Sequence, residues 1–421
     1  MIEIQPLTKN LDTEILIPGS KSYTHRICIF SALSNGMCRI SNALKCEDTS
    51  LTINALKRLG VTLEEQDADL VIQGTSGKLK GDGEIYLGNC GTGLRLLTAV
   101  AALAEGRTVL RGDARMHQRP IEELISGLQQ IGIPVRSLFG NGCPPLEVTG
   151  KSTISGGRVR LRGDVSSQFI SALLILAPLT RDGITIEMTT PPVSRPYIDL
   201  TIDLMRQFGV TVVHNGYELF QVPGEQTYRA GCYTVEPDVT NASYFWAAAA
   251  ITGGKVTVRG ISRASKQGDL KFLSLLEAMG AIVLDSSEGI TVIGSSLRGI
   301  EVDMGDSPDI VPTLAVVAAF AEGVTRIHNV AHLKLKESDR LAAIATELSK
   351  MGIVTRRTDD SLVITGGTPH GAEIETYNDH RIAMAFSVAG LKVQGIRIRN
   401  HTCVGKSFPT YWAVFDRLYT S

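Results

Sequence analysis

Five helix ends of the same kind recur at nearly constant spacing along the chain. Each is an amphipathic stretch that stops at a glycine: ALKRLGV, GLQQIGI, LMRQFGV, LLEAMGA and ELSKMGI. The glycines are Gly60, Gly132, Gly209, Gly280 and Gly352, which lie 72, 77, 71 and 72 residues apart. Glycine just after the last helical turn adopts the left-handed conformation at little cost. The spacing therefore predicts a repeated structural unit of roughly 70 residues.

Each repeat also contains a second kind of helix, which has almost no polar face. After the glycine come short stretches typical of a β-hairpin, as in GVTLEEQDADLVIQG. A polar motif follows, and behind it runs an apolar stretch such as LLTAVAALAEG, ISALLILAPL, FWAAAAITGG or LAVVAAFAEG. A helix that is apolar on all sides has to be buried on all sides. The pattern therefore predicts an α/β fold with these helices inside and the sheets and amphipathic helices outside.

The sixth copy of the repeat is divided between the two ends of the chain. PGSKSYTHRICIFSALSNG near the start has the polar motif and the buried helix, whereas SFPTYWAVFDRLY at the end has the amphipathic helix. MIEIQPL can supply a strand to the C-terminal half. We therefore expect two domains of three repeats each. Residues 19–236 form the first domain, and residues 1–18 together with 237–421 form the second.

Composition and charge narrow the class of partner. The formal net charge of the 421 residues is −1, so no overall positive field attracts nucleic acid or an anionic membrane. The seven cysteines are scattered without metal-ligand spacing, which indicates reduced thiols and no zinc site. The N-terminus lacks the layout of a signal peptide, and the apolar runs are too short for a membrane span. We expect a cytoplasmic monomer without nucleic-acid or membrane partners.

The starts of the helices carry hydroxyl, amide and cationic side chains. Free N–H groups and partial positive charge favour an anion at a helix start. The residues at the starts of the buried helices are Lys21, Ser22, Arg26, Asn89, Gly91, Thr92, Arg95, Ser166, Ser167, Gln168, Asp309, His380 and Arg381. The amphipathic helices add Arg119, Ser194, Tyr197, Lys336, Glu337, Arg340 and Lys406. Any one motif can be an ordinary helix cap, but the repetition favours a site for a substrate with several anionic groups.

Two acids lie among these cations. The stretch HLKLKESDR contains Glu337, and DSPDI contains Asp309. A carboxylate held among cations stays ionised and can accept a proton, whereas a partly desolvated one can donate a proton. Taken alone, KESDR is typical of a solvated helix face, and Asp309 can simply favour the helix dipole. Their place among groups suited to anions favours acid and base roles for both.

Nine motifs together carry a specific resemblance. They are GSKSYTHR, GNCGTGLR, GDARMHQRP, GDVSSQF, PPVSRPYI, DSPDI, KESDR, NDHRIAM and GKSFP. In this order, from residue 18 to residue 409, they resemble the 5-enolpyruvylshikimate-3-phosphate synthase family. The resemblance implies a two-domain inside-out α/β barrel of six βαβαββ repeats, three per domain, with an active site in a cleft that closes on substrate. It also implies transfer of the carboxyvinyl group of phosphoenolpyruvate to the 5-hydroxyl of 3-phosphoshikimate, with no metal or organic cofactor.

The resemblance implies a role for each matching residue. Contacts to 3-phosphoshikimate are implied for Lys21, Ser22, Arg26, Ser166, Ser167, Gln168, Ser194, Tyr197, Asp309, His332 and Lys336. Contacts to phosphoenolpyruvate are implied for Lys21, Gly91, Arg119, Gln168, Arg340, His380, Arg381 and Lys406. The implied catalytic residues are Asp309, which takes the hydroxyl proton, Glu337, which protonates the methylene carbon, and Lys21. The resulting tetrahedral intermediate then loses phosphate.

Two positions depart from the pattern of the family. His332 stands where many relatives have asparagine, and Leu96 follows the GTGLR motif where many glyphosate-sensitive relatives have proline. Gly91 is the residue that leaves room for glyphosate, so the resemblance predicts inhibition by this compound.

Two other functions share parts of the pattern. The sister transferase that acts on UDP-N-acetylglucosamine has the same fold and a similar length. It carries a cysteine in a mobile loop and a Lys-Asn pair, where this chain has RGDARMHQRP and KS. A DNA sliding clamp is also a ring of repeated α/β units, but it needs cations along the helices that line its hole. Here those helices are rich in alanine and leucine, and the cations gather at their starts.

Overall fold

Within residues 1–420, which the computed structural model describes apart from the side chain of residue 82, six helices are buried on almost every side. They are α1 (Lys21–Leu33), α3 (Gly91–Val100), α5 (Ser167–Leu176), α7 (Val239–Thr252), α9 (Val311–Ala319) and α11 (His380–Gly390). All of α9 and all of α11 is buried, which leaves no face for water. The prediction that the apolar helices lie inside is confirmed.

A second set of helices has one buried and one exposed face. They are α2 (Glu47–Arg58), α4 (Glu122–Gln130), α6 (Pro196–Gln207), α8 (Lys271–Met279), α10 (Arg340–Lys350) and α12 (Tyr411–Phe415). The predicted glycine stops are confirmed, because the backbone is left-handed at each, with φ of 88°, 76°, 82°, 115° and 80° in chain order. The last helix, α12, is shorter than the pattern predicted, with five residues followed by a 3₁₀ turn over Asp416–Tyr419. No glycine stop follows this helix in the sequence.

The helices and strands divide between two compact units. One is Gly19–Val235, and the other joins Met1–Pro18 to Glu236–Ser421. The first unit contains the sheets β14 (Cys232–Thr234), β3 (Met37–Ser41), β5 (Asp69–Gln73), β4 (Thr62–Gln66); β6 (Leu79–Tyr86), β7 (Ala104–Arg111), β9 (Leu146–Gly150), β8 (Val135–Ser137); and β10 (Gly157–Leu161), β11 (Ile184–Met188), β13 (Leu219–Val222), β12 (Val213–Asn215), each in spatial order. The second contains β16 (Ile282–Asp285), β17 (Gly289–Ile293), β15 (Lys255–Arg259), β2 (Asp12–Leu16); β18 (Glu301–Asp303), β19 (Val324–His328), β21 (Leu362–Thr365), β20 (Val354–Arg357); and β1 (Ile2–Ile4), β23 (Ile396–Ile398), β22 (Glu373–Ile374).

The four-stranded sheets repeat one pairing scheme. Strand β6 runs parallel to β7, and β9 pairs antiparallel with both β7 and β8. The sheets that begin with β10 and β18 follow the same rule. A parallel pair needs a crossover, and the buried helix α3 supplies it between β6 and β7. Each crossover therefore sets the start of a buried helix just beyond the first strand of its repeat.

Strands at three places pair with partners far away in the sequence. Strand β1 pairs antiparallel with β23, so the first residues of the chain complete the last sheet. Strand β2 runs parallel to β15, and β14 runs parallel to β3. The segments after β2 and β14 lead directly into α1 and α7, and they are the two places where the chain passes from one unit to the other.

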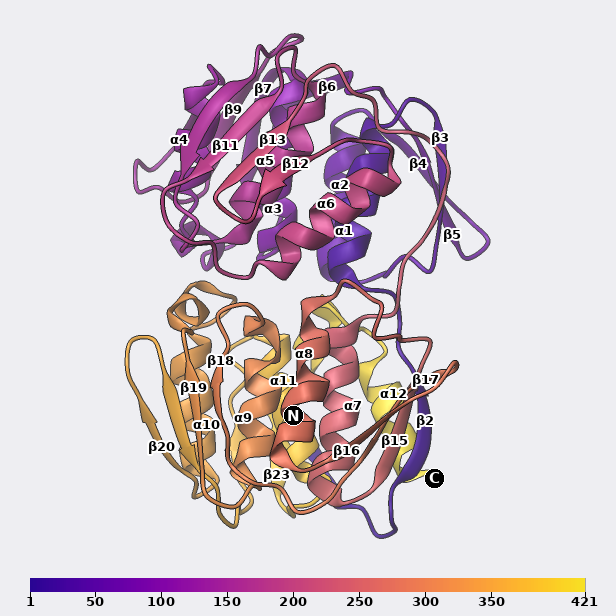
Figure 1. Cartoon of the computed structure of the whole chain (residues 1–421), viewed down its shortest axis with the longest axis vertical. Helices are drawn as coiled ribbons and strands as arrows, with labels where there is room; N and C mark the ends of the chain where they lie inside the picture. The colour runs from indigo at the N-terminus through magenta and orange to yellow at the C-terminus, as the bar shows by residue number, and fades with distance from the viewer. Residues whose placement is uncertain (421) are drawn as a thin grey trace. The chain divides into compact units, whose positions relative to one another are not determined.

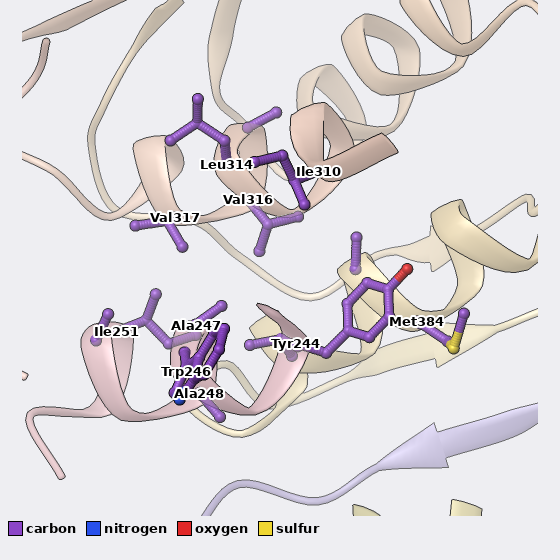
Figure 2. Packing of buried hydrophobic residues seen from close by; sticks show 14 of the residues in the cluster. Tyr244, Trp246, Ala247, Ala248, Ile251, Ile310, Leu314, Val316, Val317 and Met384 are labelled. Atoms are coloured by element: carbon purple, nitrogen blue, oxygen red, sulfur yellow. The ribbon is translucent and has the colours of Figure 1, made fainter. Parts of the chain in front are cut away.

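The core of the second unit is built around α7, α9 and α11, which pack against one another (Figure 1). Figure 2 shows Trp246 and Ala247 of α7 facing Val317 of α9, with Met384 of α11 beside Tyr244. Short alanine side chains on α7 leave room for the larger residues of its neighbours. The indole Nε1 of Trp246 donates to Ile290 O at 3.1 Å, so its polar atom is satisfied inside the core. No helix among the described residues has the length and apolar character to cross a membrane.

Candidate functional site

The predicted residues of Gly19–Val235 lie at helix starts. Lys21 opens α1, Gly91 opens α3, and Ser167 opens α5. Ser194 lies just before α6, is buried, and has a left-handed backbone with φ 54°. Polar groups buried at such ends are expensive unless they bind a partner, so these positions suit a polar ligand.

Lys21 forms a buried ion pair. Its Nζ lies 2.9 Å from Asp48 Oδ2, and the two side chains are 11% and 2% exposed. Asp48 belongs to the first turn of α2, so the pair joins the starts of two helices. The carboxylate fixes the direction of the ammonium group, which still has further donors for a second acceptor. Lys21 is thus a positioned cation at the start of α1.

Arg26, Ser22 and Tyr197 are brought together. Arg26 Nε donates to Thr201 Oγ1 at 2.8 Å, and its two terminal nitrogens donate to Ser22 O at 3.0 Å and Tyr197 O at 3.4 Å. Burial lowers the pKa of Arg26 to about 10, so the guanidinium remains charged at neutral pH. All three acceptors are neutral oxygens, which leave the positive charge in place for an anion.

Gln168 links the starts of α3 and α5. Its Oε1 accepts from Arg95 Nη1 at 2.7 Å, and its Nε2 donates to Thr92 Oγ1 at 2.9 Å. The Oγ of Ser166 accepts from Gln168 N at 3.3 Å and caps α5. The predicted Ser166 and Gln168 therefore meet residues of the GNCGTGLR motif in one hydrogen-bonded group. Leu96 of the same motif is fully buried within α3.

Arg119 lies against the start of α3. Its Nη1 donates to Asn89 O at 3.1 Å and to Asn89 Oδ1 at 3.0 Å. A Cβ on Gly91 would lie 2.6 Å from Arg119 Nη2, so only glycine leaves the guanidinium in this position. The absence of a side chain at position 91 thus has a local reason, which is the close approach of Arg119.

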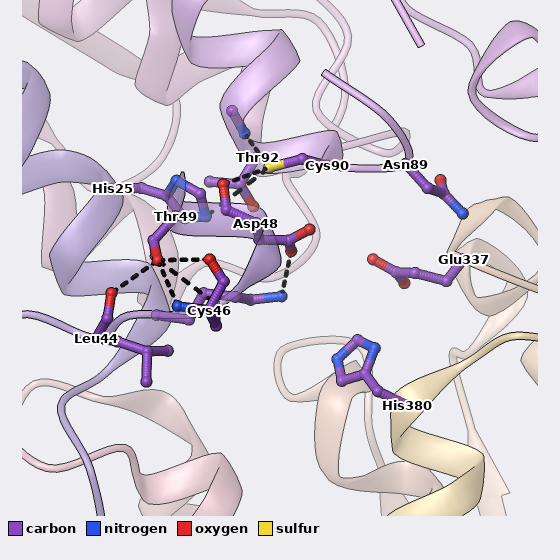
Figure 3. Close-up of polar contacts among 12 residues, drawn as sticks. His25, Leu44, Cys46, Asp48, Thr49, Asn89, Cys90, Thr92, Glu337 and His380 are labelled. Atoms are coloured by element: carbon purple, nitrogen blue, oxygen red, sulfur yellow. Dashed lines mark hydrogen bonds and ion pairs between the residues drawn. The ribbon is translucent and has the colours of Figure 1, made fainter. Parts of the chain in front are cut away.

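One group of potential metal ligands lies behind Lys21. Among the described residues, ligand atoms of His25, Asp48 and Cys90 lie within 4.8 Å of one another, and all three residues are buried (Figure 3). Imidazole, carboxylate and thiolate groups together suit a zinc ion. However, Asp48 already has the ammonium of Lys21 as its cationic partner, and Cys90 Sγ accepts from Gly93 N at 3.3 Å as the cap of α3. The geometry therefore fits a hydrogen-bonded support for Lys21 better than a metal centre.

Arg340 is the centre of the polar cluster in the other unit. Its side chain is 1% exposed and contacts three carboxylates: Asp309 Oδ1 at 2.9 Å, Glu337 Oε2 at 2.7 Å and Asp379 Oδ2 at 2.8 Å. Burial alone would lower the pKa of Arg340, but the negative charges of Asp379, Glu337 and Asp309 outweigh it and raise the pKa above its usual value. The guanidinium is permanently charged and fixed in orientation.

Asp309 bridges Arg340 and Arg381. Arg381 Nη2 donates to Asp309 Oδ2 at 2.6 Å. Burial would raise the pKa of Asp309, but the charges of Arg381, Arg340 and Lys336 outweigh it and hold the pKa well below its usual range. The carboxylate is therefore ionised in the free protein. The predicted residues Asp309, Glu337, Arg340 and Arg381 lie in one contiguous group.

The remaining predicted residues of this unit surround the cluster. His332 is buried in the 3₁₀ turn Ala331–Leu335, and burial followed by the charge of Lys336 lowers its pKa to about 3. His380 is buried at the start of α11, with Nδ1 3.8 Å from Asp379 Oδ1. Lys406 is buried in the 3₁₀ turn His401–Lys406, which packs against α11. His332 is a neutral group at neutral pH, although it adjoins several cations.

Three acids of these clusters escaped the sequence analysis. Asp48 holds Lys21, Asp379 holds Arg340, and Asp269 accepts a hydrogen bond from Thr240 at the start of α7. Burial and the charge of Asp309 raise the pKa of Asp269 to about 7. Asp379 caps α11 directly before His380, so its helix-cap position was a usable signal.

The whole chain matches proteins of one kind. The family model described as EPSP synthase (3-phosphoshikimate 1-carboxyvinyltransferase) matches residues 6–415. A protein of this name from Methanoculleus marisnigri is 43% identical over 96% of both chains. The chloroplastic protein of the same name from Arabidopsis thaliana is 42% identical over 99% of this chain and 84% of its own length.

Solved structures agree in fold. EPSP synthase from Acinetobacter baumannii superposes with a TM-score of 0.83, 29% identity, and coverage of 99% of this chain and 98% of that chain. The enolpyruvyl transferase NikO from Streptomyces tendae gives a TM-score of 0.78 at 20% identity, with 99% and 96% coverage. These likenesses confirm the predicted fold class, an inside-out α/β barrel protein of two domains built from six βαβαββ repeats.

Proposed function

The chain belongs to the EPSP synthase family, and on this basis we propose that it transfers the 1-carboxyvinyl group of phosphoenolpyruvate to the 5-hydroxyl of 3-phosphoshikimate, releasing phosphate. The observation that carries this proposal is the match of nearly the whole chain to proteins named 3-phosphoshikimate 1-carboxyvinyltransferase, at 41–43% identity. A transferase acting on UDP-N-acetylglucosamine and a DNA sliding clamp are not favoured.

The proposed ligands of 3-phosphoshikimate are hydroxyl, amide and cationic groups. They are Lys21, Ser22, Arg26, Ser166, Ser167, Gln168, Ser194, Tyr197, Asp309, His332 and Lys336. Arg26 supports a role in binding phosphate, because its guanidinium is held by neutral oxygens and keeps its full charge. Since His332 is buried and its pKa is lowered to about 3, we propose a neutral hydrogen-bonding role for its imidazole.

The proposed ligands of phosphoenolpyruvate are mainly cations. They are Lys21, Gly91, Arg119, Gln168, Arg340, His380, Arg381 and Lys406. Phosphate and carboxylate groups pair well with the planar fork of arginine. These cations would also stabilise the phosphate as it leaves, because charges already in position require no rearrangement during the reaction.

Two carboxylates supply the proposed acid and base work. Glu337 protonates the methylene carbon of phosphoenolpyruvate, while the 5-hydroxyl oxygen attacks the adjacent carbon and loses its proton to Asp309. The new C–O bond gives a tetrahedral intermediate. Loss of a proton from its methyl group and departure of phosphate restore the double bond. These steps need proton transfer and charge stabilisation only, so the proposal includes no metal or organic cofactor.

The ion pairs of Asp309 bear on its proposed role as a base. A carboxylate whose pKa is held well below its usual range by Arg381 and Arg340 is a weak proton acceptor. We propose that the anionic substrates compete for these guanidinium groups and so raise the proton affinity of Asp309. Phosphoenolpyruvate binding should then be accompanied by proton uptake, measured by calorimetry in two buffers of different ionisation enthalpy. Identical heats in the two buffers would contradict this coupling.

The proposed setting of the enzyme is the cytoplasm, where it acts as a monomer. The seven cysteines are all unpaired thiols, which supports a reducing compartment. Light scattering after size exclusion would test the monomer, and a mass near 45.3 kDa is expected.

Phosphate release tests the proposed reaction directly. Purified protein is incubated with 3-phosphoshikimate and phosphoenolpyruvate, and inorganic phosphate is followed by a coupled assay. We expect release only when both substrates are present. Controls omit either substrate, and one replaces 3-phosphoshikimate by UDP-N-acetylglucosamine. No phosphate from the first pair, or faster release with the sugar nucleotide, would overturn the proposal.

A further inference from the structure

Glu347 of α10 is a fully buried carboxylate that the proposed reaction does not use. Its side chain is 0% exposed. It accepts from Lys350 Nζ at 2.7 Å and 2.9 Å, from Tyr377 Oη at 2.7 Å, and from Glu375 N at 3.1 Å. A charge removed from water needs several partners to be tolerated, and these four bonds supply them. Two of the donors belong to the segment that leads into α11.

The same face of α10 also carries Arg340. Arg340 and Glu347 are seven residues apart, which is close to two helical turns, so their side chains project in similar directions. Arg340 contacts Asp379, whereas Glu347 contacts Glu375 and Tyr377. The segment 375–379 is therefore held at two points by one helix face.

Between these two points the backbone is unusual. Tyr377 and Asn378 are both left-handed, with φ of 53° and 54°, although neither is glycine. Side chains rarely adopt this conformation, so the surroundings must hold it. Glu347 holds Tyr377 through its hydroxyl, and Asn400 Nδ2 donates to Asn378 Oδ1 at 3.0 Å. The turn thus depends on contacts outside itself.

The residues directly after this turn orient both guanidinium groups of the cluster. Asp379 accepts from Arg340 Nε at 2.8 Å and from Ser338 Oγ at 2.9 Å. Its other oxygen accepts from Arg381 N at 3.0 Å, which fixes the first turn of α11. A change in the path of residues 377 and 378 would therefore shift Asp379, and with it Arg340 and Arg381.

We propose that Glu347 is a positioning residue for the reaction, which acts through Tyr377 and the left-handed turn to set the guanidinium groups of Arg340 and Arg381 for phosphoenolpyruvate. This inference rests on the proposed function, because it assigns those arginines to that substrate. Glu347 itself contacts neither reacting group; it fixes the distance between α10 and the start of α11.

Replacing Tyr377 by phenylalanine is the sharpest test, because it removes one hydroxyl and keeps the ring. Tyr419→Phe is a matched control in the same unit. The two tyrosines are 39% and 36% exposed, and Tyr419 Oη donates to Gln5 O at the same 2.7 Å, far from the turn. Both variants should lose similar small amounts of thermal stability. Only Tyr377→Phe should raise the KM for phosphoenolpyruvate, by roughly threefold to tenfold.

A second readout does not depend on activity. The amide of Arg381 is bonded to Asp379, so hydrogen exchange of a peptide covering residues 376–383 reports the order of the turn. Exchange should be faster in Tyr377→Phe than in Tyr419→Phe. Glu347→Gln should lie between the wild type and Tyr377→Phe in KM, because the amide keeps an acceptor for the same donors.

The outcomes separate this inference from the proposed function. If the wild type releases no phosphate from the substrate pair, the function fails, while the exchange comparison still tests the turn. If the wild type is active and Tyr377→Phe keeps a wild-type KM and wild-type exchange, the positioning role is refuted, whatever the change in unfolding temperature. Equal rises in KM for the two tyrosine variants would refute it as well.

Discussion

The Gly91→Ala substitution would place a methyl group against the guanidinium of Arg119. An ideal Cβ at position 91 lies 2.6 Å from Arg119 Nη2 and 2.8 Å from both Cζ and Nη1. Nonbonded contacts are favourable at about 3.5–4.0 Å, so the guanidinium has to move by roughly 1 Å. The backbone does not oppose alanine, because Gly91 is the first helical residue of α3. The perturbation is therefore confined to Arg119 and its neighbours.

Arg119 has little freedom to absorb this movement. It is 3% exposed, and its Nη1 is held by both oxygens of Asn89 at 3.0 Å and 3.1 Å. A misplacement of about 1 Å in a substrate-orienting group can lower a rate by roughly 100-fold. We expect kcat/KM for phosphoenolpyruvate to fall by about 10- to 100-fold, equivalent to about 1.4–2.8 kcal/mol. Inhibition by glyphosate should weaken as well, because the methyl group fills the space at Gly91.

Steady-state kinetics with saturating 3-phosphoshikimate and varied phosphoenolpyruvate would measure this effect. Gly231→Ala is the matched control in the same unit, because its Cβ would meet Tyr233 Oη at an ordinary 3.6 Å. That variant should keep wild-type kinetics, and both proteins should unfold within a few degrees of the wild type. A folded Gly91→Ala protein with unchanged kcat/KM for phosphoenolpyruvate would refute the placement of Arg119 on this substrate.

Three further predictions concern the cluster around Arg340. Glu337→Gln keeps the shape of the side chain but removes the proton-transfer group, so kcat should fall at least 100-fold while substrate Kd changes by less than about threefold; a loss of binding alone would contradict the acid role. Asp379→Ala leaves Arg340 buried with only Asp309 and Glu337, so urea unfolding should show a loss of about 2–3 kcal/mol, and a loss below about 0.5 kcal/mol would contradict the geometry. The pKa of His332 is about 3 when folded, below its ordinary value near 6.5, so the unfolded state binds the extra proton in this window. Relative to His332→Asn, the wild type should therefore lose stability as pH falls from about 6.5, by up to about 1.4 kcal/mol per unit, and parallel stability curves would exclude the shift.

The parts of the fold that the sequence predicts are those that depend on local conformation or on a single face. Gly60 and Gly352 ended their helices as expected, because only the backbone at one position decides the left-handed stop. Helix α9 was placed inside because no arrangement can satisfy a helix that is apolar all round. The short α12 was not foreseen, since its end is not marked by glycine.

Partners within the candidate site were harder to predict, because they depend on side chains from different elements. Lys21 and Arg340 were recognisable as cations at helix starts, yet Asp48 and Asp379 were not recognised as their acids. Arg340 and Asp379 are 39 residues apart, and Lys21 and Asp48 are 27 apart. Only the packing of one helix start against another brings them within 3 Å.

The two units hold their arginines in different ways, and the difference bears on how an anion would bind. Arg26 is held by neutral oxygens of Thr201, Ser22 and Tyr197, so a phosphate group that reached it would displace no carboxylate. Arg340 is held by carboxylates, so an anion has to take the place of one of them. The first arrangement suits an anchor that binds the same way throughout the reaction. The second couples anion binding to the proton affinity of the displaced acid, because a carboxylate that loses its guanidinium partner becomes easier to protonate. The geometry of the cations therefore bears on the proton transfers as much as on affinity.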